Sequence, residues 1–450
     1  MPFLGKHTLY TEVGKSMETK LQRITEKAKA NPNERFTSLI HLINKEMLRE
    51  CHKEMNGRKA SGVDAQTKMS YEENLEQNLD DLLGRMKRQA YKPQPARRVY
   101  IPKLGSSKMR PLGIPSYEDK LVQSALAKVM NAIYEADFLE CSFGFRPSRG
   151  AHDALKLLNQ ILNKWEIQYV VDTDIKGFFD NVDHDWTMKF IGHRIADPNM
   201  QRLINRFLKA GIMEAGIRYD TPTGTPQGGV CSPIIGNVYL HYVLDLWFDK
   251  IVRKRCKGKA YMVRYADDSV FCFQYKEDAL VFYEALKERL AKFKLEVAEE
   301  KTRIIRLNKN TTGSSGDDSF DFLGFTHYLD KDRRVKVKTS KIKYRASLLR
   351  CKTWMKENRT KPTRDFMKTL YKKLHGHLNY YGMSSNIKQL KNFIDEVRSL
   401  IFKWLNRRSQ KRSFNWDGFI LFLRKYPLPK LQGKIKPLWE LGAGASYLCE

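Results

Sequence analysis

Residues 261–270, YMVRYADDSV, place two adjacent aspartates inside a run that otherwise has the character of a buried strand. Strand interiors disfavour aspartate, and a carboxylate removed from water is costly unless it is paired, protonated or bound to a cation. Apolar or aromatic residues flank the pair on both sides, which predicts a β-hairpin with a polar two-residue tip. We therefore expect Asp267 and Asp268 at the turn, where a ligand can reach them.

An isolated pair of aspartates is most often only a good turn, because aspartate is a common turn residue. A second acidic strand changes this interpretation. In YVVDTDIKGFFDNVDHD, apolar residues lead to Asp172 and Asp174, which share one strand face because side chains alternate. Carboxylates at a strand end and at a hairpin are the oxygen ligands that Mg²⁺ prefers, and two such ions can support phosphoryl transfer.

The charge of the chain indicates a polyanionic partner. The net charge is +30, and residues 331–430 hold 28 Lys and Arg against 6 Asp and Glu. Nucleic acid is the leading interpretation of such a basic region. An anionic membrane surface is the weaker one, since no stretch approaches the roughly 18 apolar residues of a spanning helix.

The seven cysteines form no CxxC pair, which argues against a zinc ribbon, a cysteine-rich HNH nuclease and a disulfide framework. Reduced thiols of a cytosolic protein are the expected state. The N-terminal MPFLGKHTLYTEVGK also lacks the apolar core of a secretory signal.

Four motifs in a fixed order carry a family resemblance. The segments VVDTDIKGFFDNVDH, TPQGGVCSP, YADD and FLGF resemble motifs A, B, C and E of a reverse transcriptase palm. Each motif alone is weak, whereas four in order are highly specific. With RRVYIPK, RPLGIP, SFGFRPSRG, HGHLNYYG and RSLIFKWLNRRSQKRSFNW, nearly the whole chain resembles the group II intron-encoded reverse transcriptase and maturase family.

The resemblance implies an α+β fold, a right-hand polymerase with fingers and palm followed by an all-helical thumb and maturase domain. We expect an N-terminal helical extension over residues 1–90, fingers and palm over residues 91–335, and the helical RNA-binding region over residues 336–450. The palm is expected to combine an antiparallel sheet with helices.

The resemblance also implies roles for the acidic motifs. Asp174 and Asp267 would bind two Mg²⁺ ions, with Mn²⁺ as a possible substitute, and Asp268 would support the site. The carbonyl of Ile175 would complete a metal shell. Phe179 would be the steric gate that excludes a 2′-hydroxyl, although simple core packing beside Phe178 is an open alternative.

Other residues are expected to bind substrates. Lys103 and Arg110, on two arms of a fingers hairpin, would grip the triphosphate, with solvated surface charge as the alternative. Gln227 would contact the template-paired nucleotide. The primer grip would comprise Phe322, Leu323 and Gly324. The alternative is that these residues form a hydrophobic hairpin with a purely structural role. The expected RNA-binding cations of the tail are Arg407, Arg408, Lys411 and Arg412.

The resulting functional prediction is an RNA-directed DNA polymerase of a group II intron. It would bind the intron RNA to assist splicing, and support mobility by target-primed reverse transcription. Its partners would be intron RNA, an RNA template with a DNA primer, target DNA and dNTPs, without a membrane. Two alternatives stay open: a domesticated enzyme of phage defence or DNA repair, and a splicing cofactor without polymerase activity.

Two further expectations concern the setting. The sequence contains no cysteine-pair zinc site and no HNH-like run. In this respect it resembles the endonuclease-lacking lineage of the family. The protein is expected in the bacterial cytoplasm, associated with the nucleoid. Neither the host nor the oligomeric state follows from the sequence.

Overall fold

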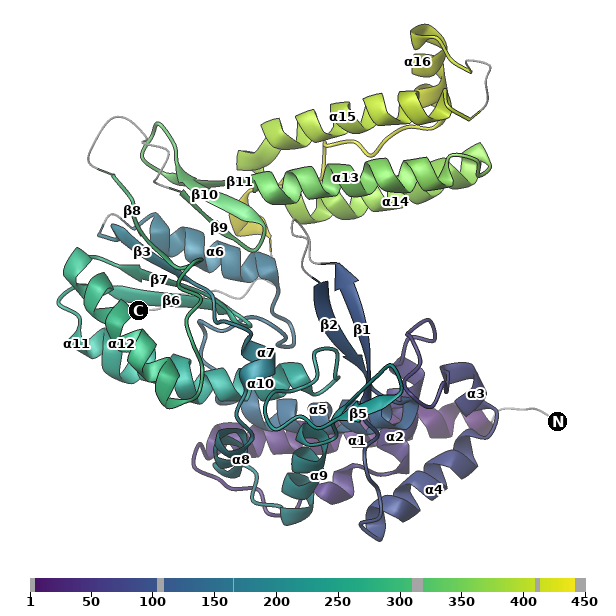
Figure 1. Ribbon diagram of the computed structural model, residues 1–450, viewed down its shortest axis with the longest axis vertical. Coiled ribbons are helices and arrows are strands. Elements are labelled where there is room, and N and C mark those ends of the chain that lie inside the picture. Colours follow the sequence, from purple (N-terminus) through teal and green to yellow (C-terminus); the bar gives the residue numbers. More distant parts are fainter. Residues whose placement is uncertain (1–4, 103–108, 165, 310–318, 409–412, 442–450) are drawn as a thin grey trace.

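The computed structural model describes residues 5–102, 109–164, 166–309, 319–408 and 413–441, with side chains from residue 17 onward. Its architecture is α+β, as the sequence predicts. In Figure 1 the N-terminal helices lie at the bottom, the palm sheet at the left and the thumb helices across the top, with a two-stranded hairpin rising between them.

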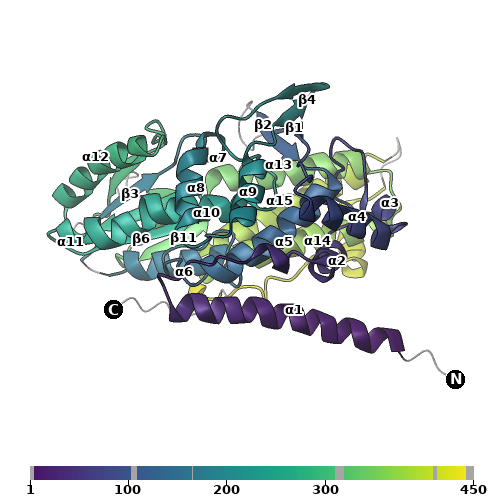
Figure 2. The same cartoon turned by 90° about the horizontal axis from the view of Figure 1, so that it is seen from below.

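The N-terminal helices pack beneath the fingers, and the long first helix runs along one side of the molecule in Figure 2. In the second helix the buried Met47, Leu48 and Cys51 follow a helical spacing, and Asn44 caps its start by accepting a hydrogen bond from the Met47 amide. The elements are α1 (Gly5–Ala30), η1 (Ile40–Leu42), α2 (Lys45–Glu54), α3 (Lys68–Glu72) and α4 (Leu75–Lys87).

The fingers contain the predicted hairpin, and Arg110 lies on its second strand. Its strands pair antiparallel from Arg97 with Ile114 to Pro102 with Met109, and the first strand also pairs in parallel with a later one. The elements are β1 (Ala96–Pro102), β2 (Met109–Ile114), α5 (Tyr117–Tyr134), α6 (Ala151–Leu162), β4 (Ile212–Glu214) and β5 (Ile217–Tyr219).

The palm is a four-stranded antiparallel sheet in the order β6-β7-β3-β8, covered by helices. One long helix runs from Ser232 to Arg255 and contains two π-helical segments. The elements are β3 (Tyr169–Thr173), α7 (Phe178–Asn181), α8 (His184–Gly192), α9 (Pro198–Leu208), α10 (Ser232–Leu240), η2 (His241–Asp245), η3 (Phe248–Val252), α11 (Arg253–Arg255), β6 (Ala260–Tyr265), β7 (Asp268–Phe273), α12 (Lys276–Lys292) and β8 (Arg303–Arg306).

The C-terminal region opens with a small sheet and continues as helices. The division expected between residues 335 and 336 falls inside its last strand, because VKVKT keeps alternating buried valines with lysines. The elements are β9 (Ser319–Phe322), β10 (Phe325–Leu329), β11 (Val335–Thr339), α13 (Lys341–Asn358), α14 (Thr363–Tyr381), η4 (Ser384–Asn386), α15 (Ile387–Leu405), α16 (Trp416–Lys425) and η5 (Leu438–Glu440).

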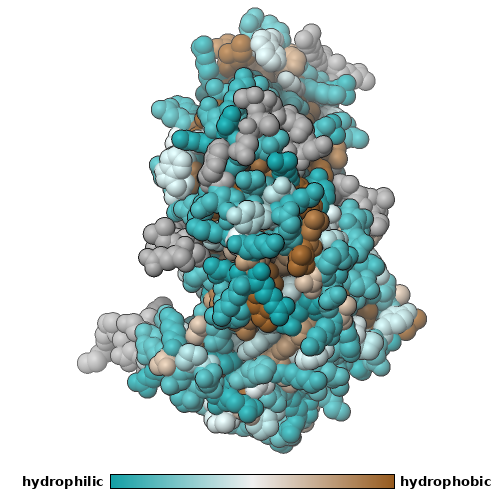
Figure 3. Space-filling view, turned by 90° about the vertical axis from the view of Figure 1, so that its left-hand side faces the viewer, coloured by the Kyte–Doolittle hydropathy of each residue, from teal (hydrophilic) through white to brown (hydrophobic). Residues whose placement is uncertain are grey.

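The palm and the thumb share one apolar core. Leu155 of α6, Val170 of β3 and Phe325 of β10 are buried in the same cluster as Leu374 of α14 and Val397 of α15. The face shown in Figure 3 is mainly hydrophilic. Among the described residues, no helix combines the length and the apolar character needed to cross a bilayer.

Candidate active site

The YADD segment forms the predicted hairpin, with a tip that lies one residue earlier than expected. Strands β6 and β7 pair from Ala260 with Phe273 to Tyr265 with Asp268, so the tip consists of Ala266 and Asp267. Asp268 is already the first residue of β7. Ala266 turns the chain with a φ of 57°, and its carbonyl accepts a hydrogen bond of 2.9 Å from the Arg264 guanidinium. This bond fixes the turn at residue 266.

The palm sheet brings the two acidic motifs together. Strands β3 and β7 pair antiparallel through Thr173 and Ser269, which places the next residue, Asp174, beside the tip of the hairpin. Burial, and then the charge of Asp174, raise the pKa of Asp267. Burial together with the charges of Asp267 and Asp174 raises the pKa of Asp268 to about 6, although part of this side chain is exposed. The carboxylates of Asp267 and Asp268 are therefore destabilised by burial and by repulsion from their acidic neighbours.

Asp172 extends this acidic surface along β3. Burial, partly offset by Arg303 and reinforced by Asp268, raises its pKa to about 7. Asp172 is thus more easily protonated than Asp268.

Lys301 supplies the one close positive partner that the structure gives Asp174. Its ammonium donates a hydrogen bond to Asp174 Oδ2, and this contact raises the pKa of Lys301. The lysine lies in the turn that precedes β8. The sequence analysis missed it, because a single lysine in EEKT has no pattern that separates it from surface charge.

The backbone at Ile175 fits the predicted carbonyl ligand. The Ala298 amide donates to the Asp174 carbonyl (2.8 Å), and the Lys176 amide donates to the Glu296 carbonyl (2.9 Å). In such a bridge between Ile175 and Val297, the peptide groups of the central residue point away from the partner strand. The Ile175 carbonyl is therefore left to face another ligand.

Arg110 and Gln227, two of the residues predicted to bind the nucleotide, contact each other. Arg110 Nε donates to Gln227 Oε1 (2.8 Å), and Gln227 Nε2 lies 3.5 Å from Asp180 Oδ2. Burial raises the pKa of Asp180, and the charges of Arg98 and Arg110 oppose that rise. Asp180 and Arg98 were missed by the sequence analysis. Lys103 lies outside the described residues.

The glycines of TPQGG let this loop lie directly against the fingers hairpin. The Gly113 amide donates to the Gln227 carbonyl (2.6 Å). Gly228 has a φ of 109°, and a Cβ there would lie 2.6 Å from the Gly113 carbonyl oxygen. Only glycine allows this close approach, which holds Gln227 next to Arg110.

Phe179 occupies a half-buried position that is compatible with both of its interpretations. Its ring packs edge-to-face on buried Phe178 at 5.1 Å between centroids. A Cβ on Gly236 would lie 3.1 Å from Phe178 and 3.2 Å from Phe179, so α10 has a glycine where these two rings approach it. The role of Phe179 as a steric gate stays a prediction.

The FLGF segment forms the tight turn between β9 and β10. Phe322 is buried, while Leu323 and Gly324 have φ values of 49° and 84°. The Tyr380 hydroxyl donates to the Leu323 carbonyl (2.8 Å), and the Ser340 amide donates to the Gly324 carbonyl (3.0 Å). Tyr380 belongs to the HGHLNYYG tract, which therefore supports the predicted primer grip.

The predicted RNA-binding residues Arg407 and Arg408 have different surroundings. Arg407 lies over the Trp404 ring at 5.7 Å, whereas Arg408 lies over Phe366 at 5.4 Å and donates to Thr363 Oγ1. Burial lowers the pKa of Arg408. Lys411 and Arg412 lie outside the described residues. Arg408 is thus largely engaged in packing, and its role toward RNA stays a prediction.

The aromatic residues of the tail also separate. Trp354 stacks on Phe366, and Tyr380 and Tyr381 pack against Phe325. Tyr371 and Trp416 are exposed by 43% and 50%. Tyr371 stacks on His375 and Trp416 packs edge-to-face on Phe402, and the exposed part of each ring could stack on a base.

Comparison with known sequence families agrees with this geometry. Residues 101–327 match the family described as reverse transcriptase (RNA-dependent DNA polymerase). Residues 345–418 match the maturase-specific domain of group II introns. The first match spans the fingers, the palm and the primer-grip hairpin, and the second covers most of the thumb helices.

Curated relatives match at greater length. The chain is 30% identical to the group II intron-encoded protein LtrA of Lactococcus lactis subsp. cremoris, over 83% of this chain and 75% of that protein. It is 32% identical to the protein YkfC of Escherichia coli, over 66% of this chain and 84% of that protein. A telomerase structure from Candida albicans, solved with a fragment of telomeric RNA, superposes with a TM-score of 0.42 at 13% identity, over 81% of this chain and 67% of that one. A similarity at that score carries no argument about function.

Proposed function

The chain belongs to the group II intron-encoded reverse transcriptase and maturase family, and we propose from this membership how its residues carry the two family activities. It is an RNA-directed DNA polymerase that also assists splicing. The observation that carries the catalytic proposal is the convergence of Asp174 with Asp267 and Asp268 at one end of the palm sheet.

The carboxylates fit the divalent cations that reverse transcriptases use. Burial, and then repulsion by neighbouring carboxylates, raises the pKa values of Asp267 and Asp268, and the Lys301 ammonium already sits on Asp174 as a cation would. Among the described residues, no group of three or more His, Cys, Asp or Glu side chains could hold a metal by itself. Mg²⁺ suits such a site, because it keeps several waters and takes substrate phosphates as ligands.

We assign two Mg²⁺ ions to Asp174, Asp267 and the Ile175 carbonyl, with Mn²⁺ as a substitute. When bound, the ions would stabilise the charge on the attacking 3′-oxygen and on the leaving pyrophosphate. Asp268 shapes the turn and adds negative charge. Lys301 must release Asp174 for the ions to bind, which leaves its ammonium close to the reacting phosphates.

The incoming nucleotide is assigned to the surface between the fingers and the palm. Arg110 would turn from Gln227 to the triphosphate, where its planar guanidinium can form paired hydrogen bonds. Lys103 would add a second positive charge. Phe179, next to Asp180 and near Gly236, would stand beneath the sugar and exclude a 2′-hydroxyl.

The thumb region is assigned to the RNA partners. The primer-grip turn of Leu323 and Gly324 would hold the DNA primer on its RNA template, and the basic helices after residue 340 would bind the intron RNA. Arg407 and the exposed Trp416 are the residues best placed for that contact. Target DNA would be the substrate for mobility, which implies a nucleoid-associated protein.

A binding-only splicing cofactor is disfavoured, because both acidic motifs are intact and meet in space. The decisive test is extension of a DNA primer on an RNA template with Mg²⁺. Asp174→Ala and Asp267→Ala should each lower the rate by about 10³-fold or more, since charge in the transition state loses its stabilisation. Asp332→Asn, at an exposed turn before β11, is the matched control. Near-normal extension by either alanine variant would overturn the assignment.

A further inference from the structure

Arg264 lies on β6, three residues before Asp267, and its side chain is completely buried. A guanidinium removed from water is strongly unfavourable unless its charge and all its donors are matched. The interior of the palm therefore contains a group whose presence needs a specific explanation.

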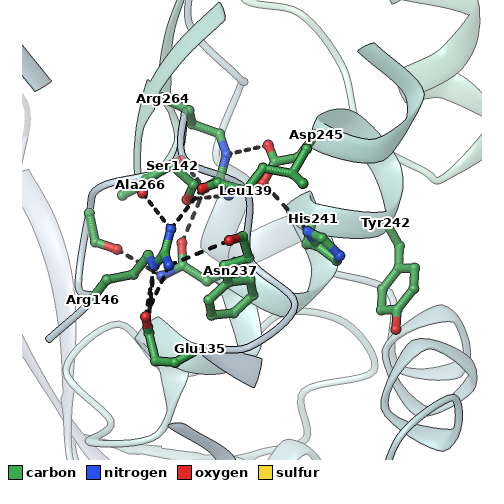
Figure 4. Close-up of polar contacts among 12 residues, drawn as sticks. Glu135, Leu139, Ser142, Arg146, Asn237, His241, Tyr242, Asp245, Arg264 and Ala266 are labelled. Carbon is green, nitrogen blue, oxygen red and sulfur yellow. Dashed lines mark hydrogen bonds and ion pairs between the residues drawn. The ribbon is translucent and has the colours of Figure 1, made fainter. Parts of the chain in front are cut away.

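All five N–H donors of Arg264 have partners, as Figure 4 shows. Nε donates to Asp245 Oδ1 (2.7 Å) and Nη2 to Asp245 Oδ2 (2.5 Å), which forms a paired ion contact. Nη2 also donates to Ser142 Oγ (2.8 Å), and Nη1 donates to Asn237 Oδ1 (3.1 Å) and to the Ala266 carbonyl (2.9 Å). A lysine, with three donors on one atom, could not replace this arrangement.

The partner Asp245 is also completely buried, and a π-helical segment places it. The wider π turn interrupts the long helix that contains α10, and such turns occur frequently at functional sites. His241, whose Nδ1 lies 4.0 Å from Asp245 Oδ2, is neutral near pH 7 because burial lowers its pKa to about 4. Arg264 is therefore the group that balances the charge of Asp245.

The same network fixes the loop SFGFR beside the hairpin. The Arg264 amide donates to the Cys141 carbonyl (2.8 Å), and the Phe143 amide donates to the Arg264 carbonyl (2.9 Å). Asn237 Nδ2 donates to the Gly144 carbonyl (2.7 Å). Gly144 lies so close to the hairpin that a Cβ there would overlap the Ala266 amide nitrogen.

We propose that Arg264 is a positioning residue for polymerisation, which fixes the Ala266 carbonyl and thereby the place of Asp267. The left-handed φ of Ala266 is unfavourable for a residue with a side chain, and the bond from Nη1 holds it. Asp245 and Asn237 orient the guanidinium, and Gly144 closes the turn from the other side. This inference rests on the proposed role of Asp267 as a metal ligand.

The test replaces Arg264 and Asp245 together by apolar residues, so that neither charge is left buried without its partner. Exchange of a buried ion pair for apolar residues is often neutral for folding, so Arg264→Met with Asp245→Leu should still fold. The expected result is a fall in kcat of about 100-fold, as for a misplaced catalytic group. Mn²⁺ binding, measured by electron paramagnetic resonance on the complex with primer and template, should weaken about tenfold, the same direction that a displaced carboxylate ligand implies.

The matched control is Arg194→Met with Asp137→Leu, a buried pair at 3.1 Å beside the N-terminal helices. It should match the test pair in thermal unfolding, and keep wild-type kcat and Mn²⁺ binding. If both pairs lower kcat equally, or if the Arg264 pair keeps wild-type Mn²⁺ binding, Arg264 only stabilises the core.

A second variant covers the case in which the double replacement does not fold. Asn237→Ala removes only the neutral link between Arg264 and Gly144, and should lower kcat and Mn²⁺ affinity in parallel by about three- to tenfold. Unchanged values would overturn the inference. Absence of extension by the wild-type protein would instead overturn the polymerase assignment, and the Mn²⁺ comparison would still test Arg264.

Discussion

Two hairpins to which we assign function turn at a strained tip, and the two tips are held in different ways. The catalytic hairpin, residues 260–273, turns through Ala266 with a φ of 57°. The primer-grip hairpin, residues 319–329, turns through Leu323 with a φ of 49°. A buried ion pair holds the first tip, whereas a tyrosine hydroxyl and a backbone amide hold the second.

The two tips differ in the domain to which their hydrogen bonds attach them. Arg264 and Asp245 both belong to the palm, so the carboxylate that they position is fixed relative to the palm sheet. Tyr380 and Ser340 belong to α14 and to the start of α13, so the primer-grip turn is tied to the thumb. A charged network in a dry interior is stronger and more directional than neutral hydrogen bonds. The proposed metal ligand Asp267 is thus fixed relative to the palm, and the proposed primer grip is coupled to the thumb.

The largest difference expected between the two hairpins comes from adding one methyl group next to each tip. Gly144→Ala should displace the catalytic turn, because its Cβ would overlap the Ala266 amide and lie 2.9 Å from the Tyr265 carbonyl carbon. We expect kcat to fall by about 100-fold. Gly324→Ala would meet the Tyr381 hydroxyl at 3.1 Å at a φ of 84°, and should mainly raise the KM for primer–template. Steady-state extension assays on both variants measure this contrast.

Circular dichroism controls for folding in both variants, since each substitution costs about 1–3 kcal/mol of stability by overpacking or backbone strain. The comparison fails if the two glycine variants change kcat and KM in the same proportion. That result would mean that both hairpins act as one rigid unit.

The next effect concerns selection of deoxynucleotides over ribonucleotides, which we assign to Phe179 of the palm. Phe179→Val should raise incorporation of ribonucleotides relative to deoxynucleotides by about tenfold, because a shorter side chain leaves room for a 2′-hydroxyl. Single-nucleotide incorporation with matched dNTP and NTP measures the ratio. An even loss of both activities would identify Phe179 as core packing beside Phe178.

The same contrast explains what the sequence could predict. Asp174, Asp267 and the FLGF turn could be predicted as candidates because alternating strands, acidic residues and a glycine leave a local pattern. Lys301, Asp180 and Arg264 were missed, since each acts through partners that are distant in the sequence. Arg264 lies only three residues from the catalytic turn, yet Asp245 and Ser142 reach it through the fold.

The predicted position of the hairpin tip was wrong for a different reason. The pattern of charged and apolar residues predicted the turn at Asp267 and Asp268, whereas Arg264, within the same hairpin, binds the Ala266 carbonyl and the tip consists of Ala266 and Asp267. The expected division between residues 335 and 336 falls inside β11, whose alternating pattern the basic composition obscures.

A smaller effect tests the link between the primer grip and the thumb. Tyr380→Phe removes the hydroxyl that donates to the Leu323 carbonyl and leaves the ring packed on Phe325. Loss of one neutral hydrogen bond costs about 1 kcal/mol, so the KM for primer–template should rise roughly fivefold with kcat unchanged. A fall in kcat without a change in KM would mean that this bond serves the chemical step and not primer placement. Tyr371→Phe, at an exposed ring of the same helix, is the control.

The smallest effect is a difference in how the two hairpins respond to pH without metal. Burial and neighbouring carboxylates raise the pKa of Asp268 from 3.8 to about 6, whereas burial lowers the pKa of His327 in β10 from 6.5 to about 3. Between these values the native catalytic hairpin binds more protons than the unfolded chain, so its contribution to stability falls as pH rises toward 6. The native primer-grip hairpin binds fewer protons than the unfolded chain, so its contribution is lost as pH falls below 6.5.

Unfolding midpoints measured in EDTA from about pH 4 to about pH 6, where the pKa ranges of both groups overlap, separate the two contributions. Asp268→Asn should make stability rise more steeply with pH, because the opposing carboxylate term is removed. His327→Phe, which keeps a ring stacked on Phe320, should make it fall more steeply. Added Mg²⁺ should reproduce the Asp268→Asn slope in the wild-type protein, since a bound cation keeps the carboxylates ionised, and should leave the effect of His327→Phe unchanged. If both substitutions shift the slope in the same direction, the two hairpins do not differ in the way that their buried groups imply.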